Sequence, residues 1–205
     1  AQMRLFHLSD LHIGKRVNEF SMIEDQKYIL ERILDLAEKE MPDGVILAGD
    51  IYDKQIPSAE AVQVFDEFIT KLAERKFPVF VISGNHDSAE RLAFGGRLLN
   101  SRGIYLSPVY DGTVMKIPIA DQYGTVWIHL LPFIRPAAVR RVFEDESDLI
   151  TDVQSAVRAV ISHMEIDPNE RNILVAHQFV TGASRCESED IQVGGLDNID
   201  ASVFE

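Results

Sequence analysis

Apolar runs that stop abruptly at polar residues organise this chain. The clearest run covers residues 45–48, ends at Gly49 and is followed by Asp50 and Asp53. Four apolar residues in succession are typical of a parallel strand that is covered on both faces, and in parallel sheets ligands gather beyond the carboxyl ends of the strands. The pattern therefore predicts a strand that delivers carboxylates to a site.

Three further apolar runs end in a similar way, at residues 4–8, 77–83 and 172–177. Between these runs, apolar residues recur at helical spacing. Ser21 and Glu24 have the form of a capping box at the start of the first such stretch. Helices are predicted at residues 21–40, 58–75, 88–100 and 147–164.

Residues 104–132 change to short apolar runs separated by turn residues, which predicts antiparallel strands. These strands belong either to a second sheet or to a continuation of the first. The predicted helices at residues 58–75 and 88–100 carry apolar residues that we expect mainly to pack in the core, with contacts to a second copy of the chain as the alternative. They are Val62, Phe65, Phe68, Ile69 and Leu72 on the first of these helices, and Leu92, Phe94, Leu98 and Leu99 on the second. The alternation of strands and helices indicates an α/β fold.

The composition is that of a globular protein. No run of about 18 apolar residues is present to span a bilayer, and the first residues lack the layout of a signal peptide. Cys186 is the single cysteine of the 205 residues, so no internal disulfide is expected. We therefore expect a cytoplasmic protein without a membrane partner.

The formal net charge of −13 argues against a protein that grips nucleic acid through a broad basic surface. Carboxylates have another use, because a cluster of them holds divalent cations that then attract a phosphate. The net charge does not separate these two cases.

The ends of the four apolar runs carry side chains that bind metals. If the runs are neighbours in one sheet, their ends form a cluster of carboxylate, amide and imidazole groups, which suits manganese, iron or zinc. The candidate residues are Asp10, His12, Asp50, Asp53, Asn85, His86 and His177.

The remaining histidines receive structural interpretations. His7 and His129 lie inside apolar runs, so we expect them to be hydrogen-bonded core residues. His163 lies near the end of the last predicted helix, and we do not expect it to bind a metal.

Four short motifs resemble the successive motifs of calcineurin-like metallophosphoesterases. They are Asp10-Leu-His12, Gly49-Asp-Ile-Tyr-Asp53, Gly84-Asn-His-Asp87 and Val175-Ala-His177. The sequence around the first motif and the tail at residues 193–205 resemble the DNA nucleases of that family. The resemblance covers essentially the whole chain and implies an αββα sandwich of two mixed sheets flanked by helices.

The resemblance also implies roles for individual residues. Asp10 and His12 would bind one metal, Asn85 and His177 a second, and Asp50 would bridge the two. We expect two divalent metals, with manganese ahead of iron, zinc and magnesium.

The same resemblance places His86 beside the scissile phosphate and makes Asp53 the carboxylate that orients His86. Lys15, Arg16 and Arg135 are candidates for contacts to substrate phosphates. The implied reaction is attack on phosphorus by a hydroxide held between the two metals.

One family motif, a further Gly-His-x-His, does not occur in these 205 residues. We therefore expect residues 1–205 to be a truncated nuclease domain with partial metal occupancy, without the cap domain and the segment that binds an ATPase partner. DNA, that ATPase and a second copy of the chain are the expected partners.

The expected activity is metal-dependent DNA hydrolysis in repair, recombination and replication, exonucleolytic on double strands and endonucleolytic on single strands and hairpins. Two alternatives remain at the level of sequence. In the first alternative, the chain is another metallophosphoesterase that acts on nucleotides, cyclic nucleotides or phosphoproteins. In the second, it is a non-catalytic dimerisation or docking module.

Overall fold

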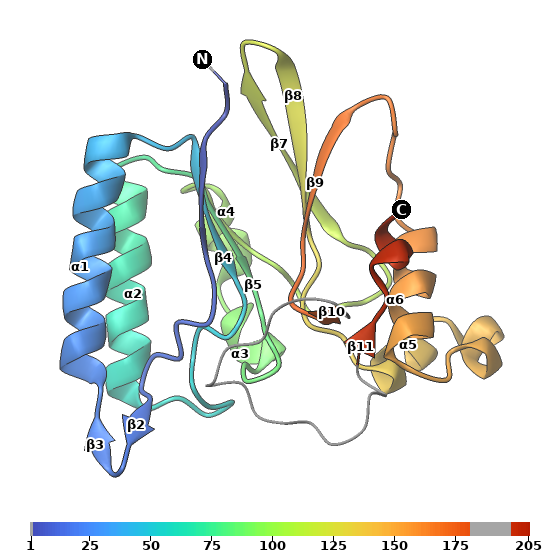
Figure 1. Cartoon of the computed structure of the whole chain (residues 1–205), viewed down its shortest axis with the longest axis horizontal. Coiled ribbons are helices and arrows are strands. Elements are labelled where there is room, and N and C mark those ends of the chain that lie inside the picture. The colour runs from blue at the N-terminus through green and yellow to red at the C-terminus, as the bar shows by residue number, and fades with distance from the viewer. Residues whose placement is uncertain (1, 181–197) are drawn as a thin grey trace. The chain divides into compact units, whose positions relative to one another are not determined.

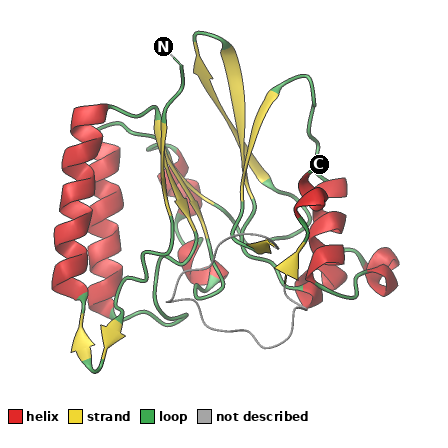
Figure 2. Cartoon of the chain, viewed as in Figure 1, coloured by secondary structure: helices red, strands yellow, loops and turns green. Residues whose placement is uncertain are grey.

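A computed structural model describes residues 2–180 and 198–205 (Figures 1 and 2). Cys186 and the start of the 193–205 tail lie outside the described residues. The chain divides into two compact units, of which the first comprises Ala1–Val109, Met115–Phe133 and Pro168–His177. The second comprises Tyr110–Val114, Ile134–Asp167 and Gln178–Glu205.

A parallel sheet lies at the centre of the first unit. Its strands, in spatial order, are β1 (Leu5–Leu8), β4 (Gly44–Ala48), β5 (Val79–Ile82) and β6 (Ile104–Leu106). Every residue of β4 and β5 is buried. Parallel strands that are covered on both faces need such unbroken apolar sequences, so the strand predicted at residues 45–48 is confirmed.

Two long helices cover one face of this sheet, α1 (Ile23–Glu40) and α2 (Ala59–Glu74), and Figure 1 shows them side by side. Leu34 and Leu72 are buried in the core cluster that also contains Leu47 and Val79 of the sheet. Ser58 caps α2 by accepting a hydrogen bond from the Ala61 N–H at 3.1 Å.

The capping box predicted at the start of α1 is wrong. Ser21 belongs to a small hairpin, β2 (Arg16–Val17) and β3 (Phe20–Ser21), and α1 begins after Met22 instead. The hairpin uses the backbone of Ser21 for pairing with Arg16, which leaves it outside the first turn of the helix.

A second sheet is formed by β7 (Met115–Asp121), β8 (Gly124–Leu130) and β9 (Arg171–Val175). It is mixed, because β7 and β8 are antiparallel whereas β8 and β9 are parallel. Its inner face packs against the first sheet in a separate core cluster that contains Phe80 and Ile128. The α/β class with two sheets and flanking helices is confirmed. The apolar run at residues 172–177, however, forms β9 of the second sheet and is not a neighbour of the other three runs in the first sheet.

The helix predicted at residues 88–100 is interrupted. It forms two short helices, α3 (Ala89–Leu92) and α4 (Gly96–Asn100), separated by Gly95 with a φ of 75°. Phe94 is 86% exposed and Leu98 is 79% exposed, so their predicted core positions are wrong. Val62 is also exposed, because Ala61, Val64 and Phe65 occupy the buried side of α2.

The second unit is built around α6 (Val153–Ser162), which begins later than residue 147. Asp152 and Ser155 form a reciprocal capping box at its start. The other elements of this unit are α5 (Pro136–Val142), η1 (Glu144–Leu149), β10 (Phe179–Val180), β11 (Asn198–Ile199) and η3 (Ala201–Phe204). Among the described residues, no helix combines the length and the apolar character that a membrane crossing needs.

Candidate metal centre

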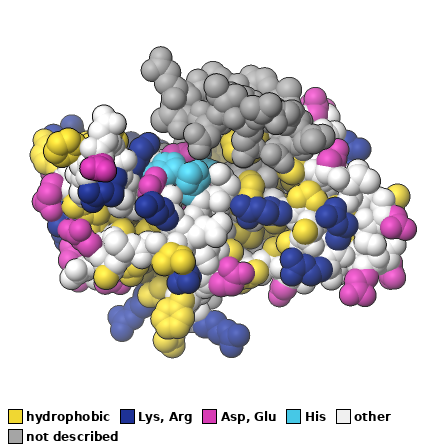
Figure 3. All heavy atoms as spheres, turned by 90° about the horizontal axis from the view of Figure 1, so that it is seen from below, with side chains coloured by type: hydrophobic (Ala, Val, Ile, Leu, Met, Phe, Trp, Pro, Cys, Tyr) yellow, Lys and Arg dark blue, Asp and Glu magenta, His cyan; other side chains and the backbone are white. Residues whose placement is uncertain are grey.

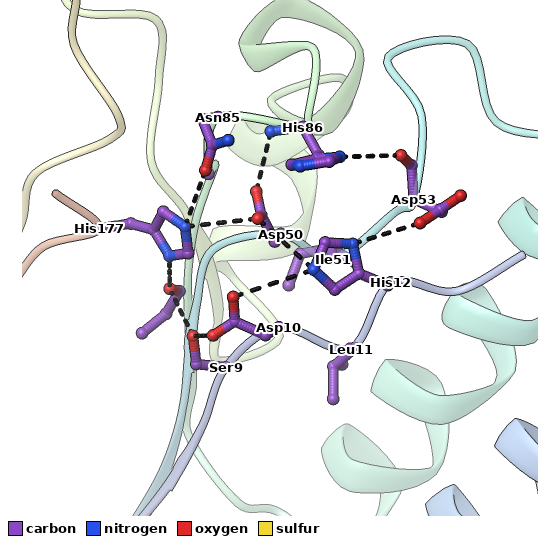
Figure 4. Close-up of polar contacts among 12 residues, drawn as sticks. Ser9, Asp10, Leu11, His12, Asp50, Ile51, Asp53, Asn85, His86 and His177 are labelled. Atoms are coloured by element: carbon purple, nitrogen blue, oxygen red, sulfur yellow. Dashed lines mark hydrogen bonds and ion pairs between the residues drawn. The ribbon is translucent and has the colours of Figure 1, made fainter. Parts of the chain in front are cut away.

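The strand ends of the first unit bring the predicted metal-binding and catalytic residues together. Figure 4 shows them converging from the loops that follow β1, β4, β5 and β9. From another side, a group of histidine side chains is exposed with acidic side chains beside it (Figure 3). The assembled residues are Asp10, His12, Asp50, Asp53, Asn85, His86 and His177.

Asp50 occupies the middle of this group and is only 3% exposed. Its Oδ2 atom lies 3.4 Å from His177 Nε2 and 3.6 Å from His12 Nε2. Its Oδ1 atom accepts a hydrogen bond from the His86 backbone N–H at 2.9 Å. One carboxylate oxygen therefore faces an imidazole on each side.

His177 is held so that one ring nitrogen faces the group. Its Nδ1 donates to the Ala48 carbonyl oxygen at 2.7 Å, and its Nε2 lies 3.1 Å from Asn85 Oδ1. A backbone carbonyl on one nitrogen is a common way to fix the tautomer of a metal-binding histidine. His177 Nε2, Asn85 Oδ1 and Asp50 Oδ2 thus form one potential ligand set.

Burial and charge act in opposite directions on Asp50 and His177. Burial disfavours the charged form of His177, but the hydrogen bond and the negative charge of Asp50 prevail and raise the pKa of His177. Burial also works against ionisation of Asp50, yet hydrogen bonds from His177 and the His86 backbone lower its pKa. The pair therefore favours an ionised Asp50, which is the form that binds a cation.

The other half of the group contains Asp10 and His12. His12 Nε2 lies 3.9 Å from Asp10 Oδ1, and donor atoms of Asp10, His12 and Asp50 all lie within 4.8 Å of one another. The other ring nitrogen of His12, Nδ1, is buried and faces Asp53 instead. These oxygen and nitrogen donors fit a divalent transition metal.

Asp53 contacts two histidines through different atoms. Its carboxylate Oδ1 lies 3.4 Å from His12 Nδ1, whereas its backbone carbonyl oxygen lies 3.1 Å from His86 Nδ1. The two imidazole rings meet edge to face, with centroids 4.9 Å apart. The expected contact between Asp53 and His86 is thus made by the backbone, and the carboxylate is placed to orient His12 instead. Donor atoms of His12, Asp53 and His86 also lie within 4.8 Å of one another.

Three of the predicted ligands have backbones in the left-handed region, with φ of 57° at Asp10, 44° at His12 and 49° at Asp50. Such conformations cost non-glycine residues about 1–2 kcal/mol each, and they concentrate at functional sites. Backbone hydrogen bonds offset this cost here, because the Asp10 and His12 N–H groups donate to the carbonyl oxygens of Gly49 and Asp50.

Two glycines leave room for the ligands. A Cβ atom on Gly84 would lie 2.2 Å from Asp50 Oδ1, and one on Gly49 would lie 2.6 Å from His177 Nδ1. Gly49 also has a φ of 91°. Both glycines are therefore required by close contact with a predicted ligand.

The predicted phosphate-binding residues Lys15, Arg16 and Arg135 do not all lie in the same part of the structure. Arg16 lines a pocket of about 480 Å³ that also reaches Asp53 and is bounded by the hairpin and the loop before α2. Lys54 lines the same pocket and was missed by sequence reasoning, although it directly follows the second motif. Lys15 is partly buried beside the hairpin. Arg135 belongs to the second unit.

Two supporting residues were also missed. Asp87 lies in the third motif but had no assigned role, and Gln26 lies on the buried side of α1 at helical spacing from Ile23 and Leu30. A polar residue on an apolar stripe was the signal that could have identified Gln26.

The other histidines have mixed outcomes. His129 is 3% exposed and its Nε2 contacts Asn172 Oδ1 at 2.9 Å, which confirms a core role. His7 is exposed on β1, so its predicted core position is wrong, because β1 is the outermost of the four described strands of its sheet. His163 stacks on Phe143 and pairs with Glu146.

A family model of calcineurin-like phosphoesterases matches residues 3–197. The chain belongs to the calcineurin-like phosphoesterase family.

The chain is similar to two curated proteins that are named as the SbcD component of the SbcCD nuclease. It is 34% identical to the one from Staphylococcus saprophyticus over 98% of this chain and 53% of the relative. It is also 34% identical to the one from Staphylococcus epidermidis, over 98% of this chain and 54% of the relative. The chain thus spans about half the length of the curated relatives it matches.

Among solved structures, the chain is similar to Yfce, a phosphoesterase from E. coli, with 14% identity and a TM-score of 0.32. The match covers 62% of this chain and 56% of that chain.

Replacing Gly84 by alanine tests the packing of the ligands. The new Cβ must displace Asp50, so we expect the affinity for Mn²⁺ to fall by about tenfold or more, as measured by isothermal titration. Gly96→Ala is the matched control, because its Cβ would meet Leu106 Cβ at an ordinary 3.6 Å. Equal Mn²⁺ affinities of the two variants would contradict the close packing of Gly84 on Asp50.

Proposed function

We propose that residues 1–205 form the nuclease domain of an enzyme that hydrolyses DNA phosphodiester bonds with two divalent metals, of which manganese is the first choice. The observation that carries the proposal is the position of Asp50 Oδ2, within 3.6 Å of an imidazole nitrogen on either side. A carboxylate in this position suits a bridge between two metals. Iron, zinc and magnesium are the alternatives to manganese.

In this proposal, Asp10 and His12 would hold one metal, Asn85 and His177 would hold the other, and Asp50 would serve both. When bound, the metals supply charge for the phosphate and lower the pKa of water, which gives a nucleophile at neutral pH.

His86 is assigned the proton transfer to the departing sugar oxygen. Its backbone is fixed by Asp50 Oδ1, and its Nδ1 is occupied by the Asp53 carbonyl oxygen. Nε2 is therefore the ring atom that we expect to hold and release the proton. Asp53 supports the ring through its backbone, and its carboxylate faces His12.

The substrate strand is proposed to pass the pocket beside Asp53. Arg16 and Lys54 line this pocket, and its apolar part includes Ile13 and Ile56. Phosphates on either side of the scissile bond would meet these two cations, and we add Lys15 and Arg135 as further candidates. The local pair of Arg16 and Lys54 reconciles DNA binding with a net charge of −13.

The wider role is proposed from the relatives. Both are named as the SbcD component of the SbcCD nuclease. We infer exonuclease activity on double strands and endonuclease activity on single strands and hairpins, in cytoplasmic DNA repair, recombination and replication. Partners would be an SbcC-type ATPase and a second copy of the chain.

A second candidate function is hydrolysis of nucleotides, cyclic nucleotides or phosphoproteins. The net charge of −13 favours it, because a small substrate needs no extended basic surface. Assays of these substrates beside hairpin DNA, all with Mn²⁺, separate the two functions.

His86→Ala tests the assignment of the proton donor. We expect the rate of Mn²⁺-dependent hairpin cleavage to fall by about 10²–10⁴-fold, while Mn²⁺ binding is retained. His163→Ala is the control, because this histidine belongs to the second unit and pairs with Glu146. Cleavage by His86→Ala at the wild-type rate would sink the assignment.

Lys54→Ala tests the substrate path. Loss of a phosphate contact should raise KM for hairpin DNA several-fold and weaken its salt dependence, with little change in kcat for a small phosphodiester. Lys39→Ala removes the same charge from the end of α1 and serves as the control. If both variants change KM equally, the pocket does not bind the strand.

A further inference from the structure

The loops that carry the ligands depend on side chains outside the ligand set. Gln26 extends from α1 to the loop after β1 and makes three hydrogen bonds there. Its Oε1 accepts from the Gly14 N–H at 3.0 Å, and its Nε2 donates to the carbonyl oxygens of His12 at 2.8 Å and Leu11 at 3.2 Å. One amide thus satisfies three backbone groups around His12.

The same loop is held on its other side by the chain that follows β4. The N–H groups of His12 and Ile13 donate to the carbonyl oxygens of Asp50 and Ile51, each at 2.9 Å. Gln26 therefore holds the loop to α1 through side-chain hydrogen bonds, while backbone hydrogen bonds hold it to Asp50 and Ile51. Because His12 has a φ of 44°, its conformation needs this support from both sides.

Asp87 does the equivalent for the loops after β4 and β5. Its carboxylate is buried and accepts three backbone hydrogen bonds, from Gly84 at 2.8 Å, Tyr52 at 2.9 Å and Ile51 at 3.1 Å. Two of these donors follow Asp50 and the third precedes Asn85. Asp87 therefore fixes the distance between the backbone of Asp50 and the backbone that carries Asn85 and His86.

We propose that Gln26 and Asp87 are positioning residues of the metal centre, each of which fixes a different part of the backbone that carries the ligands. Gln26 acts on the segment that contains Asp10 and His12. Asp87 acts on Asp50, Asn85 and His86 together. Neither side chain has a place among the ligands, and the effect of each passes through backbone amides and carbonyls.

The inference rests on the metal centre of the proposed function and does not depend on DNA as the substrate. Gln26→Met preserves the length of the side chain and removes all three hydrogen bonds. Asp87→Asn preserves its shape, but the amide nitrogen then faces a backbone N–H, so at least one of the three donors loses its acceptor.

Each variant has a control of the same chemistry. Gln154 lies on α6 in the second unit, and its side chain accepts a hydrogen bond from the Asp200 N–H. Gln154→Met removes this hydrogen bond. Asp43→Asn alters a carboxylate that accepts the Arg4 N–H at 2.7 Å, beside the opposite ends of β1 and β4. These controls alter a side-chain hydrogen bond that lies away from the ligand loops.

Mn²⁺ titration calorimetry on the wild-type protein, both variants and both controls tests the inference, with thermal unfolding of the metal-free proteins measured in parallel. We expect Gln26→Met and Asp87→Asn to bind Mn²⁺ about 10–100-fold more weakly than the wild type. The controls should bind as the wild type does, whatever their melting temperatures. Amide hydrogen exchange at residues 12–14 should also become faster in Gln26→Met.

Wild-type Mn²⁺ affinity in folded Gln26→Met and Asp87→Asn proteins would overturn the inference, as would controls that lose affinity in proportion to their melting temperatures. If Asp87→Asn does not fold, Asp87→Ser, which leaves space for water, replaces it in the same comparison. A wild-type protein that binds no Mn²⁺ would overturn the metal centre and this inference together. Mn²⁺ binding without DNA cleavage would overturn only the proposed substrate.

Discussion

The position of the Asp50 carboxylate between the imidazoles of His12 and His177 is the constraint on which the rest of the site depends. Its Oδ2 atom faces His12 on one side and His177 on the other, and its Oδ1 atom anchors the backbone of His86. Both neighbouring sheets are needed to build this arrangement, because Asp50 follows β4 and His177 follows β9. The packing of Phe80 and Ile128 between the sheets thus sets the separation of the ligands.

The positive φ angles of this site cost free energy, and backbone hydrogen bonds offset that cost. The left-handed residues Asp10 and His12 donate backbone hydrogen bonds to Gly49 and Asp50, which continue the pairing of β1 and β4 beyond the regular strands. Gly84 allows the next loop to approach Asp50 closely. The site is therefore largely arranged before a metal arrives, which is the usual condition for catalysis by fixed charges.

Most of the polar group at the strand ends was predictable from sequence because its members follow apolar runs, and the carboxyl ends of such strands converge. The sheet that contains β9 was not predictable, since apolar runs do not specify their neighbours. The spacing of apolar residues predicted one helix at residues 88–100, but the chain breaks at Gly95 into two short helices, and Phe94 and Leu98 are exposed. The contacts of Gln26 and of the Asp53 carboxylate were beyond sequence reasoning, because they depend on which segments fold together.

The most direct measurement of the central claim is anomalous X-ray diffraction at the manganese edge from crystals of this protein soaked in Mn²⁺. The account predicts two anomalous peaks, each within bonding distance of an Asp50 carboxylate oxygen, one beside Asp10 and His12 and one beside Asn85 and His177. Peaks whose ligands do not include Asp50, or a metal bound only by His12, Asp53 and His86, would contradict it.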